Sequence, residues 1–81
     1  MNTTTTPPLD RPLPKSYMPE EDKIGMSQNA IYLCESVEAK EAGDEEASWA
    51  WMAMAKIPEG TKKALVKICG AEFLTARGFD L

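Results

Sequence analysis

The sequence contains no histidine, and it has only two cysteines and six aromatic residues among its 81 positions. Without histidine, the commonest general base near neutral pH is missing, and with it most catalytic triads and metal sites. The chain also has no glycine-rich phosphate loop and no Gly-x-Ser-x-Gly nucleophile elbow. We therefore expect a protein that is not an enzyme, needs no metal or other cofactor and takes no small-molecule substrate.

Long apolar runs are missing as well. No stretch approaches the roughly 18 consecutive apolar residues of a membrane span, and residues 1–17 lack the basic start and apolar core of a signal peptide. We expect a cytoplasmic protein without membrane contact, in which Cys34 and Cys69 stay reduced. Because the chain offers neither histidine nor a CxxC spacing, the two cysteines are predicted to be small buried hydrophobes rather than a disulfide or metal ligands.

Proline and threonine gather at the start of the chain, where residues 1–18 hold a run of four threonines and four of the six prolines. Proline removes backbone donors and fixes φ, so this stretch is predicted to be a disordered or polyproline-like arm. The segment RPLPK at residues 11–15 is weakly similar to proline-rich ligands, although a solvated tail is the preferred interpretation. Residues 19–81 are predicted to form a single helical domain.

Helix start and stop signals divide residues 19–81 into three main helices, at 27–42, 45–57 and 62–77. A proline followed by three acidic residues predicts a short extra helix at 19–24. The predicted N-caps are Ser27, Asp44 and Thr61, and the predicted glycine stops are Gly43 and Gly78. No stretch alternates apolar and polar residues, so the predicted fold is all-α, a small three-helix arrangement.

Apolar residues at helical spacing predict which helix faces are buried. The predicted stripes are Ala30, Leu33, Cys34 and Val37 in the first main helix, and Leu65, Ile68, Cys69 and Phe73 in the last. The middle helix is apolar nearly all round, with Ser48, Met52 and Lys56 as its one solvent-facing line. Two neighbouring helices do not obviously cover such an element, so self-association, as a homodimer for example, is expected.

The middle of the chain resembles the second helix of a tetratricopeptide repeat. In that family a small residue packs between helices, an aromatic residue follows four positions later, and proline ends the unit, as Ala47, Trp51 and Pro58 do after Gly43. The preceding helix departs from the pattern, because Glu35 falls near a position for a large apolar residue. The match covers about 30 residues, and one repeat cannot bury its own faces. The resemblance implies a helical hairpin against a third helix; the chain also resembles small acidic orphan proteins of phages and mobile elements.

Charge is distributed unevenly along the chain. Residues 19–46 carry nine acidic and two basic residues, a net charge of −7, whereas residues 47–81 carry a net charge of +2. Glu35, Glu38 and Glu41 recur every three residues along one helical face, with Asp44 and Glu45 beyond them. This pattern is typical of an ordinary solvent face, or of a docking surface for a basic groove that normally holds nucleic acid.

Trp49 and Trp51 complete the candidate partner-binding residues. Residues two apart on a helix face different ways, so one tryptophan is expected in the core and the other against the first helix or a partner. The alternative that both tryptophans simply belong to the core is equally open. The function expected from these features is that of a protein-interaction module. Its concrete form is a phage or mobile-element inhibitor of a host complex, such as an anti-CRISPR protein or a similar defence antagonist.

Three lysines in the last predicted helix support an alternative. Lys62, Lys63 and Lys67 suit contacts to nucleic acid, and a small transcriptional regulator would use this helix on DNA. The sequence pI of about 4.7 argues against an autonomous DNA binder, because affinity for phosphates comes largely from basic residues.

Overall fold

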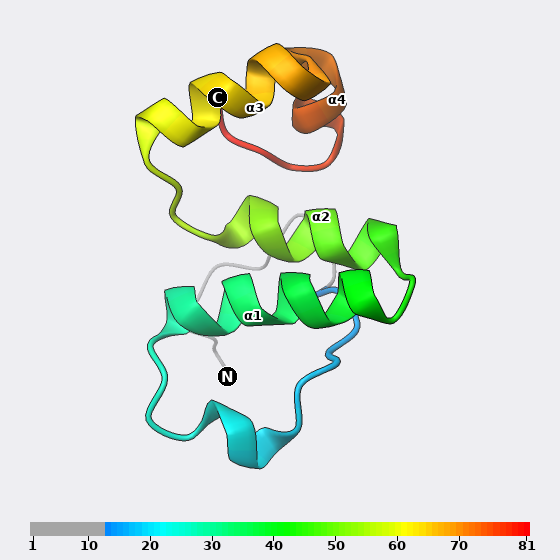
Figure 1. Ribbon diagram of the computed structural model, residues 1–81, viewed down its shortest axis with the longest axis vertical. Helices are drawn as coiled ribbons and strands as arrows, with labels where there is room; N and C mark the ends of the chain where they lie inside the picture. The colour runs from blue at the N-terminus through cyan, green and yellow to red at the C-terminus, as the bar shows by residue number, and fades with distance from the viewer. Residues whose placement is uncertain (1–12) are drawn as a thin grey trace, which may run out of the picture.

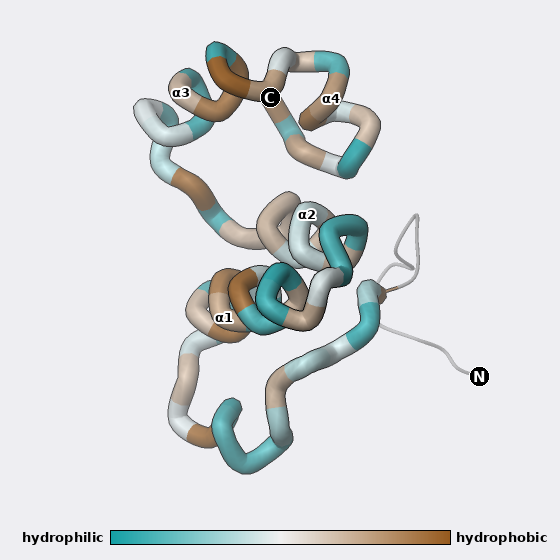
Figure 2. Tube along the Cα trace, turned by 45° about the vertical axis from the view of Figure 1, so that its right-hand side comes forward, coloured by the Kyte–Doolittle hydropathy of each residue, from teal (hydrophilic) through white to brown (hydrophobic). Residues whose placement is uncertain are grey.

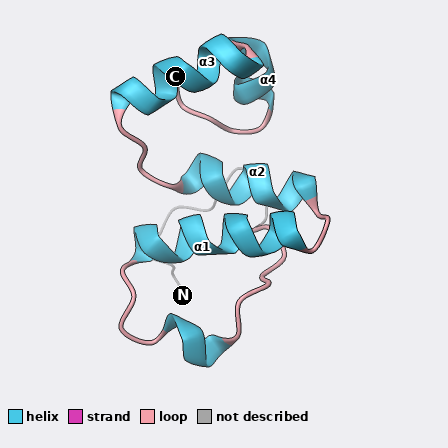
Figure 3. Ribbon diagram, in the orientation of Figure 1, coloured by secondary structure: helices cyan, strands magenta, loops and turns pink. Residues whose placement is uncertain are grey.

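The computed structural model describes residues 13–81, and the regular elements in this range are all helices (Figure 3). A short 3-10 helix, η1 (Glu20–Lys23), precedes α1 (Gln28–Glu41), α2 (Glu45–Met54), α3 (Glu59–Cys69) and α4 (Ala71–Ala76). The all-α prediction is confirmed. None of the described helices is long and apolar enough to cross a membrane. Residues 1–12, most of the predicted arm, lie outside the described residues.

Four of the predicted caps and stops lie at helix ends in the structure. The side-chain oxygens of Ser27 and Asp44 each accept the backbone amide three residues further on, at 3.2 and 3.1 Å, and so begin α1 and α2. Gly43 and Gly78, at φ angles of 85° and 99°, end α1 and α4 with the paired backbone hydrogen bonds of a Schellman motif. The turn between α1 and α2 is therefore held by side-chain and backbone hydrogen bonds on both sides.

The last predicted helix is two helices in the structure. Gly70 adopts φ 93° and ψ 144°, a conformation that residues with a Cβ rarely reach, and it separates α3 from α4. Pro58 rather than Thr61 precedes the first turn of α3. α2 ends at Met54, three residues before the predicted end, because the backbone at Ala55 is already extended.

α2 is the central element. Figure 1 shows α1 beside it on one side, with η1 beyond α1, and the α3–α4 pair on its other side. On the α1 side, Trp51 packs with the buried side chains of Ala39 and Ala47. On the α4 side, Leu74 and Phe79 are buried. α2 is therefore packed on two sides within one molecule, although only Ala47, Ser48 and Trp51 of its ten residues are buried.

α1 buries a different face from the one that its apolar stripe predicted. The buried residues are Glu35, Ser36 and Ala39, whereas Leu33 and Val37 are 40% and 55% exposed. The stripe predicted for the last helix is also not buried as a whole, since Ile68 is 79% exposed.

A pair of serines explains why α1 turns this face toward α2. The Ser36 hydroxyl donates to the Ser48 carbonyl at 2.8 Å, and the Ser48 hydroxyl donates to the Ser36 carbonyl at 2.8 Å. Two small side chains let the helix backbones approach closely, and each satisfies the other's polar atoms. The prediction that Ser48 faces solvent is wrong, because only 8% of it is exposed.

Candidate interaction surfaces

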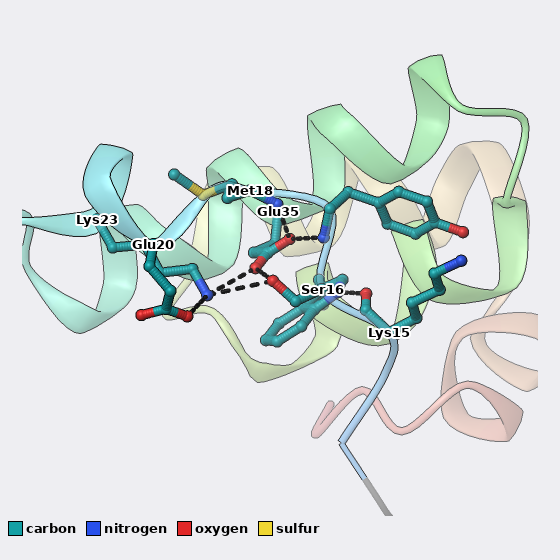
Figure 4. A network of polar contacts seen from close by, with 8 residues as sticks. Lys15, Ser16, Met18, Glu20, Lys23 and Glu35 are labelled. Carbon is teal, nitrogen blue, oxygen red and sulfur yellow. Dashed lines mark hydrogen bonds and ion pairs between the residues drawn. The ribbon is translucent and has the colours of Figure 1, made fainter.

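Glu35, predicted to lie on an exposed acidic ridge, is fully buried. One carboxylate oxygen accepts the backbone amides of Tyr17 and Met18 at 2.7 and 3.1 Å, and the other accepts the Ser16 hydroxyl (Figure 4). The Lys23 ammonium lies 3.4 Å from the second oxygen. The predicted exposure of Glu35 is therefore wrong: its carboxylate fastens the segment before η1 onto α1.

Residues 15–18, which we call the strap, were predicted to belong to the disordered arm. In the structure the Trp51 indole donates to the Lys15 carbonyl at 2.9 Å, and the Tyr17 hydroxyl donates to the Asp44 carboxylate at 2.6 Å. Together with the bonds to Glu35, these contacts hold the strap against α1 and α2. Residues 15–18 therefore make specific contacts with the helices, beginning at Lys15.

The strap also sets the ionisation of two carboxylates. Burial alone would raise the pKa of Glu35, but hydrogen bonds from the strap and from Lys23 outweigh it and leave the pKa below its ordinary value. The hydrogen bond from Tyr17 lowers the pKa of Asp44, and the same bond raises the pKa of the Tyr17 phenol. Both carboxylates are charged near neutral pH and serve as internal hydrogen-bond acceptors.

Three of the predicted acidic residues remain at the surface. Glu38, Glu41 and Glu45, which we call the acidic ridge, are exposed on the end of α1 and the start of α2. Glu45 lies 3.5 Å from the Lys40 ammonium, while Glu38 and Glu41 form no ion pair within residues 13–81. The Asp44 carboxylate, between Glu41 and Glu45 in sequence, accepts hydrogen bonds from the Tyr17 hydroxyl of the strap and from the Ala47 amide at the N-terminus of α2. The acidic ridge is thus smaller than predicted, and two of its three carboxylates, those of Glu38 and Glu41, have no ion-pair partner among residues 13–81.

The two tryptophans face opposite sides of α2, as their spacing predicted. Trp51 is 6% exposed and lies with its ring centre 6.0 Å from that of Tyr32. Trp49 is half-buried and meets Phe73 edge-on at 5.3 Å between ring centres, with Phe79 at 6.0 Å. Their contacts within the chain join α2 to α1 on one side and to α4 and the C-terminal segment on the other.

The lysines of the alternative prediction lie on α3. Lys63 and Lys67 are exposed one turn apart, whereas the Lys62 ammonium donates to the Asp80 carbonyl at 2.8 Å. Beside them is a shallow hollow of about 400 Å³, which we call the α3 groove. It is lined by Glu59, Lys62, Lys63, Val66, Lys67 and Leu81.

A second hollow, of about 410 Å³, lies between the N-terminal segment, α2 and α4. Arg77 lines it, with its guanidinium stacked 3.6 Å from the centre of the Phe73 ring and 3.9 Å from the Glu46 carboxylate. Opposite charges therefore meet within this hollow.

Among the described residues, no three His, Cys, Asp or Glu side chains are grouped so as to hold a metal ion. Cys34 and Cys69 are both free and half-buried.

No protein-family model, curated protein or solved structure matches this chain. The hairpin that the tetratricopeptide resemblance implied is present as α1 and α2, and Ala47 is buried in their shared core.

Sequence reasoning missed the strap and the groove beside α3. One signal for the strap was present, because Glu35 stands where the repeat pattern calls for a large apolar residue. A charged residue at an inward position needs a buried partner, and the partner here lies 17 to 19 residues earlier in the chain. No local pattern in the strap itself indicates this contact.

Proposed function

We propose that this chain is a non-enzymatic protein-interaction module whose acidic ridge docks on a basic surface of another protein. The proposal rests on one observation: of the neighbouring carboxylates, some are hydrogen-bonded inside the molecule and others are exposed without an ion-pair partner. Glu35 and Asp44 are engaged inside the molecule, whereas Glu38 and Glu41 are exposed and form no ion pair within the described chain. Such carboxylates contribute little to stability and are free to act in association.

The backbone around the ridge is well fixed. The Schellman motif at Gly43 and the N-cap at Asp44 define the turn that joins the two parts of the ridge. A preorganised array of charges loses less conformational entropy on binding than a flexible acidic tail does. The rigid turn therefore favours a specific docking surface over non-specific attraction.

The partner class that fits is a complex with a basic groove for nucleic acid. Lysines and arginines that bind phosphates also attract closely spaced carboxylates. Docking of the ridge in such a groove would exclude nucleic acid, so the module would act as an inhibitor. The concrete form that we propose is a phage or mobile-element inhibitor of a host complex, such as an anti-CRISPR protein or a similar defence antagonist.

The test is a pull-down from host lysate with the tagged full chain, at about 150 mM salt. The ridge variant carries E38K, E41K and E45K; the matched control carries E21K, D22K and E72K, which reverse three other exposed acidic residues. We expect a partner that the wild type and the control retain, that heparin displaces, and that the ridge variant loses at least about tenfold. Equal retention of that partner by the ridge variant, with its helical circular dichroism intact, would contradict the proposal.

The regulator remains the second candidate because Lys63 and Lys67 are exposed. A gel shift with random duplex DNA at about 150 mM salt separates the two functions. Under the leading proposal the wild type does not retard the DNA. Retardation that disappears in the K62A/K63A/K67A variant, with the salt slope falling by roughly one unit per lost phosphate contact, would establish the regulator instead.

A further inference from the structure

Two outer faces of the molecule carry apolar side chains that the described chain leaves uncovered. On α1, Leu33 and Val37 are 40% and 55% exposed, and they belong to the stripe that the sequence marks as buried. On the other side, Leu81 is 48% exposed and lines the α3 groove together with Val66; Ile68 of α3, at 79% exposed, is not among the residues that line this groove. Figure 2 shows hydrophobic segments on both of these helices.

The two faces differ in the charges that border them. Glu38 and Glu41 follow the apolar pair on α1, and both are exposed. Lys63 and Lys67 border the α3 groove, where Val66 and Leu81 supply apolar surface. Lys40 on α1 pairs with Glu45, and Glu59 lines the groove together with Lys62, Lys63 and Lys67. The first face therefore has a net acidic border and the second a net basic border.

A single copy does not bring these faces together, because α1 and α3 lie on opposite sides of α2 (Figure 1). The spacing of the exposed apolar residues along α1 nevertheless matches the spacing of the lysines along α3. Leu33 and Val37 are one helical turn apart, as are Lys63 and Lys67, and a turn advances about 5–6 Å along either helix. Two helices that run side by side can therefore match apolar with apolar and acidic with basic positions.

We propose that the missing cover is a second copy of the chain. α1 of one copy packs Leu33 and Val37 along the α3 groove of the other, with Glu38 and Glu41 facing Lys63 and Lys67. The contact joins two different surfaces, so it either closes into a dimer or ring or continues head to tail.

The size of the core supports a second copy as the occupant. The buried apolar side chains of the described chain are only Ala39, Ala47, Trp51, Leu74 and Phe79, and α3 buries none of its residues. Chains this small often gain stability by association with copies of themselves. The sequence predicted self-association from α2, but α2 packs against other elements on two sides within one molecule, whereas Leu33, Val37 and Leu81 are exposed on α1 and beside α3.

Self-association concerns the protein alone and does not depend on a hetero-partner. Self-association would affect docking on a partner protein, because a second copy and a basic partner would compete for Glu38 and Glu41. Self-association would then lower the fraction of chain available for docking.

Sedimentation velocity of the full chain from about 1 to 200 µM tests the proposal. We expect the wild-type mass to rise with concentration, and V37D to weaken association at least about tenfold. The matched control is I24D, at a side chain that is 82% exposed but lies outside both faces. Circular dichroism verifies that each variant remains helical.

A charge exchange makes the test specific. E38K/E41K and K63E/K67E should each weaken association about tenfold, whereas the quadruple variant, whose net charge equals that of the wild type, should regain it to within about threefold. A monomer at every concentration overturns the proposal. So does an equal effect of V37D and I24D, or a quadruple variant that associates no better than the two double variants.

Discussion

Glu35 and Glu38 lie on the same helix, three residues apart, in opposite environments. Glu35 is fully buried and accepts hydrogen bonds from the strap, while Glu38 is exposed and forms no ion pair within the described chain. A buried carboxylate is tolerated only where donors replace the water it has lost, and two backbone amides, a hydroxyl and an ammonium do so here. Glu35 is therefore a structural residue and Glu38 a candidate contact.

Replacing Glu35 with alanine should destabilise the fold much more than the same change at Glu38. Glu35→Ala leaves the strap amides without their acceptor, and a buried donor that loses its partner costs about 1–3 kcal/mol. Glu38→Ala should change the free energy of unfolding by no more than about 0.5 kcal/mol. Urea unfolding at neutral pH measures both, and equal midpoints for the two variants would show that the strap contact does not stabilise the fold.

The stability of the protein should fall in acid through Glu35 and Asp44. Both carboxyls have folded-state pKa values below their ordinary ones, so their contribution is complete above about pH 5 and is lost as the pH falls through the folded-state pKa values. The pKa values of Tyr17 and Lys23 are raised, so their contribution is lost only at alkaline pH, above about 10. Unfolding midpoints between about pH 2 and 7 should decline less steeply in Glu35→Gln than in wild type, and Glu38→Gln should follow wild type. Identical acid slopes for Glu35→Gln and wild type would contradict this assignment.

The pairing of α1 with α2 depends on polar as well as apolar contacts. Ser36 and Ser48 are 2% and 8% exposed, and each hydroxyl donates to the other residue's carbonyl. The reciprocal bonds fix which face of α1 meets α2, and that choice places Glu35 beneath the strap and turns Leu33 and Val37 outward.

A double-mutant cycle tests this coupling. Ser36→Ala and Ser48→Ala should each lower the free energy of unfolding by about 0.5–1.5 kcal/mol, the net value of a hydrogen bond. The double variant should lose less than the two single losses together, because either change removes part of the same network. Strict additivity in thermal or urea unfolding would mean that the two serines act independently.

Most helix ends were predictable from the sequence, but the break at Gly70 and the faces that the helices bury were not. Ser27, Gly43, Asp44 and Gly78 act locally, and their roles as caps and stops follow from residue type and position. The face of α1 depends on Ser36 meeting Ser48, a contact between two helices that apolar periodicity does not encode. For the same reason the acidic spacing placed the buried Glu35 on one exposed face with Glu38 and Glu41.

At the scale of the whole molecule, the strap joins the start of the described chain to both central helices. The sequence predicts a disordered arm over residues 1–18, and deletion of residues 1–17 from such an arm would shift the thermal midpoint by only a few degrees. The structure changes this expectation, because that deletion removes the Lys15 carbonyl, the Ser16 hydroxyl and the Tyr17 amide and hydroxyl from their partners. We now expect a fall of more than about 8 °C, which corresponds to more than about 1 kcal/mol for a domain of this size. A midpoint within a few degrees of the full chain would mean that the strap contacts add little.

In the molecule as a whole, some carboxylates are hydrogen-bonded inside the fold and others are exposed to a partner. Carbodiimide labelling of carboxylates, read out by mass spectrometry, measures this difference directly. In the free protein at about 1 µM, where self-association is weakest, Glu38, Glu41 and Glu45 should react readily and Glu35 should resist. When the protein holds its captured partner, labelling of the three ridge residues should fall while that of the exposed Glu21 and Glu72 stays constant. Reaction of Glu35 as fast as Glu38 in the free protein, or ridge labelling unchanged in the complex, would contradict the account.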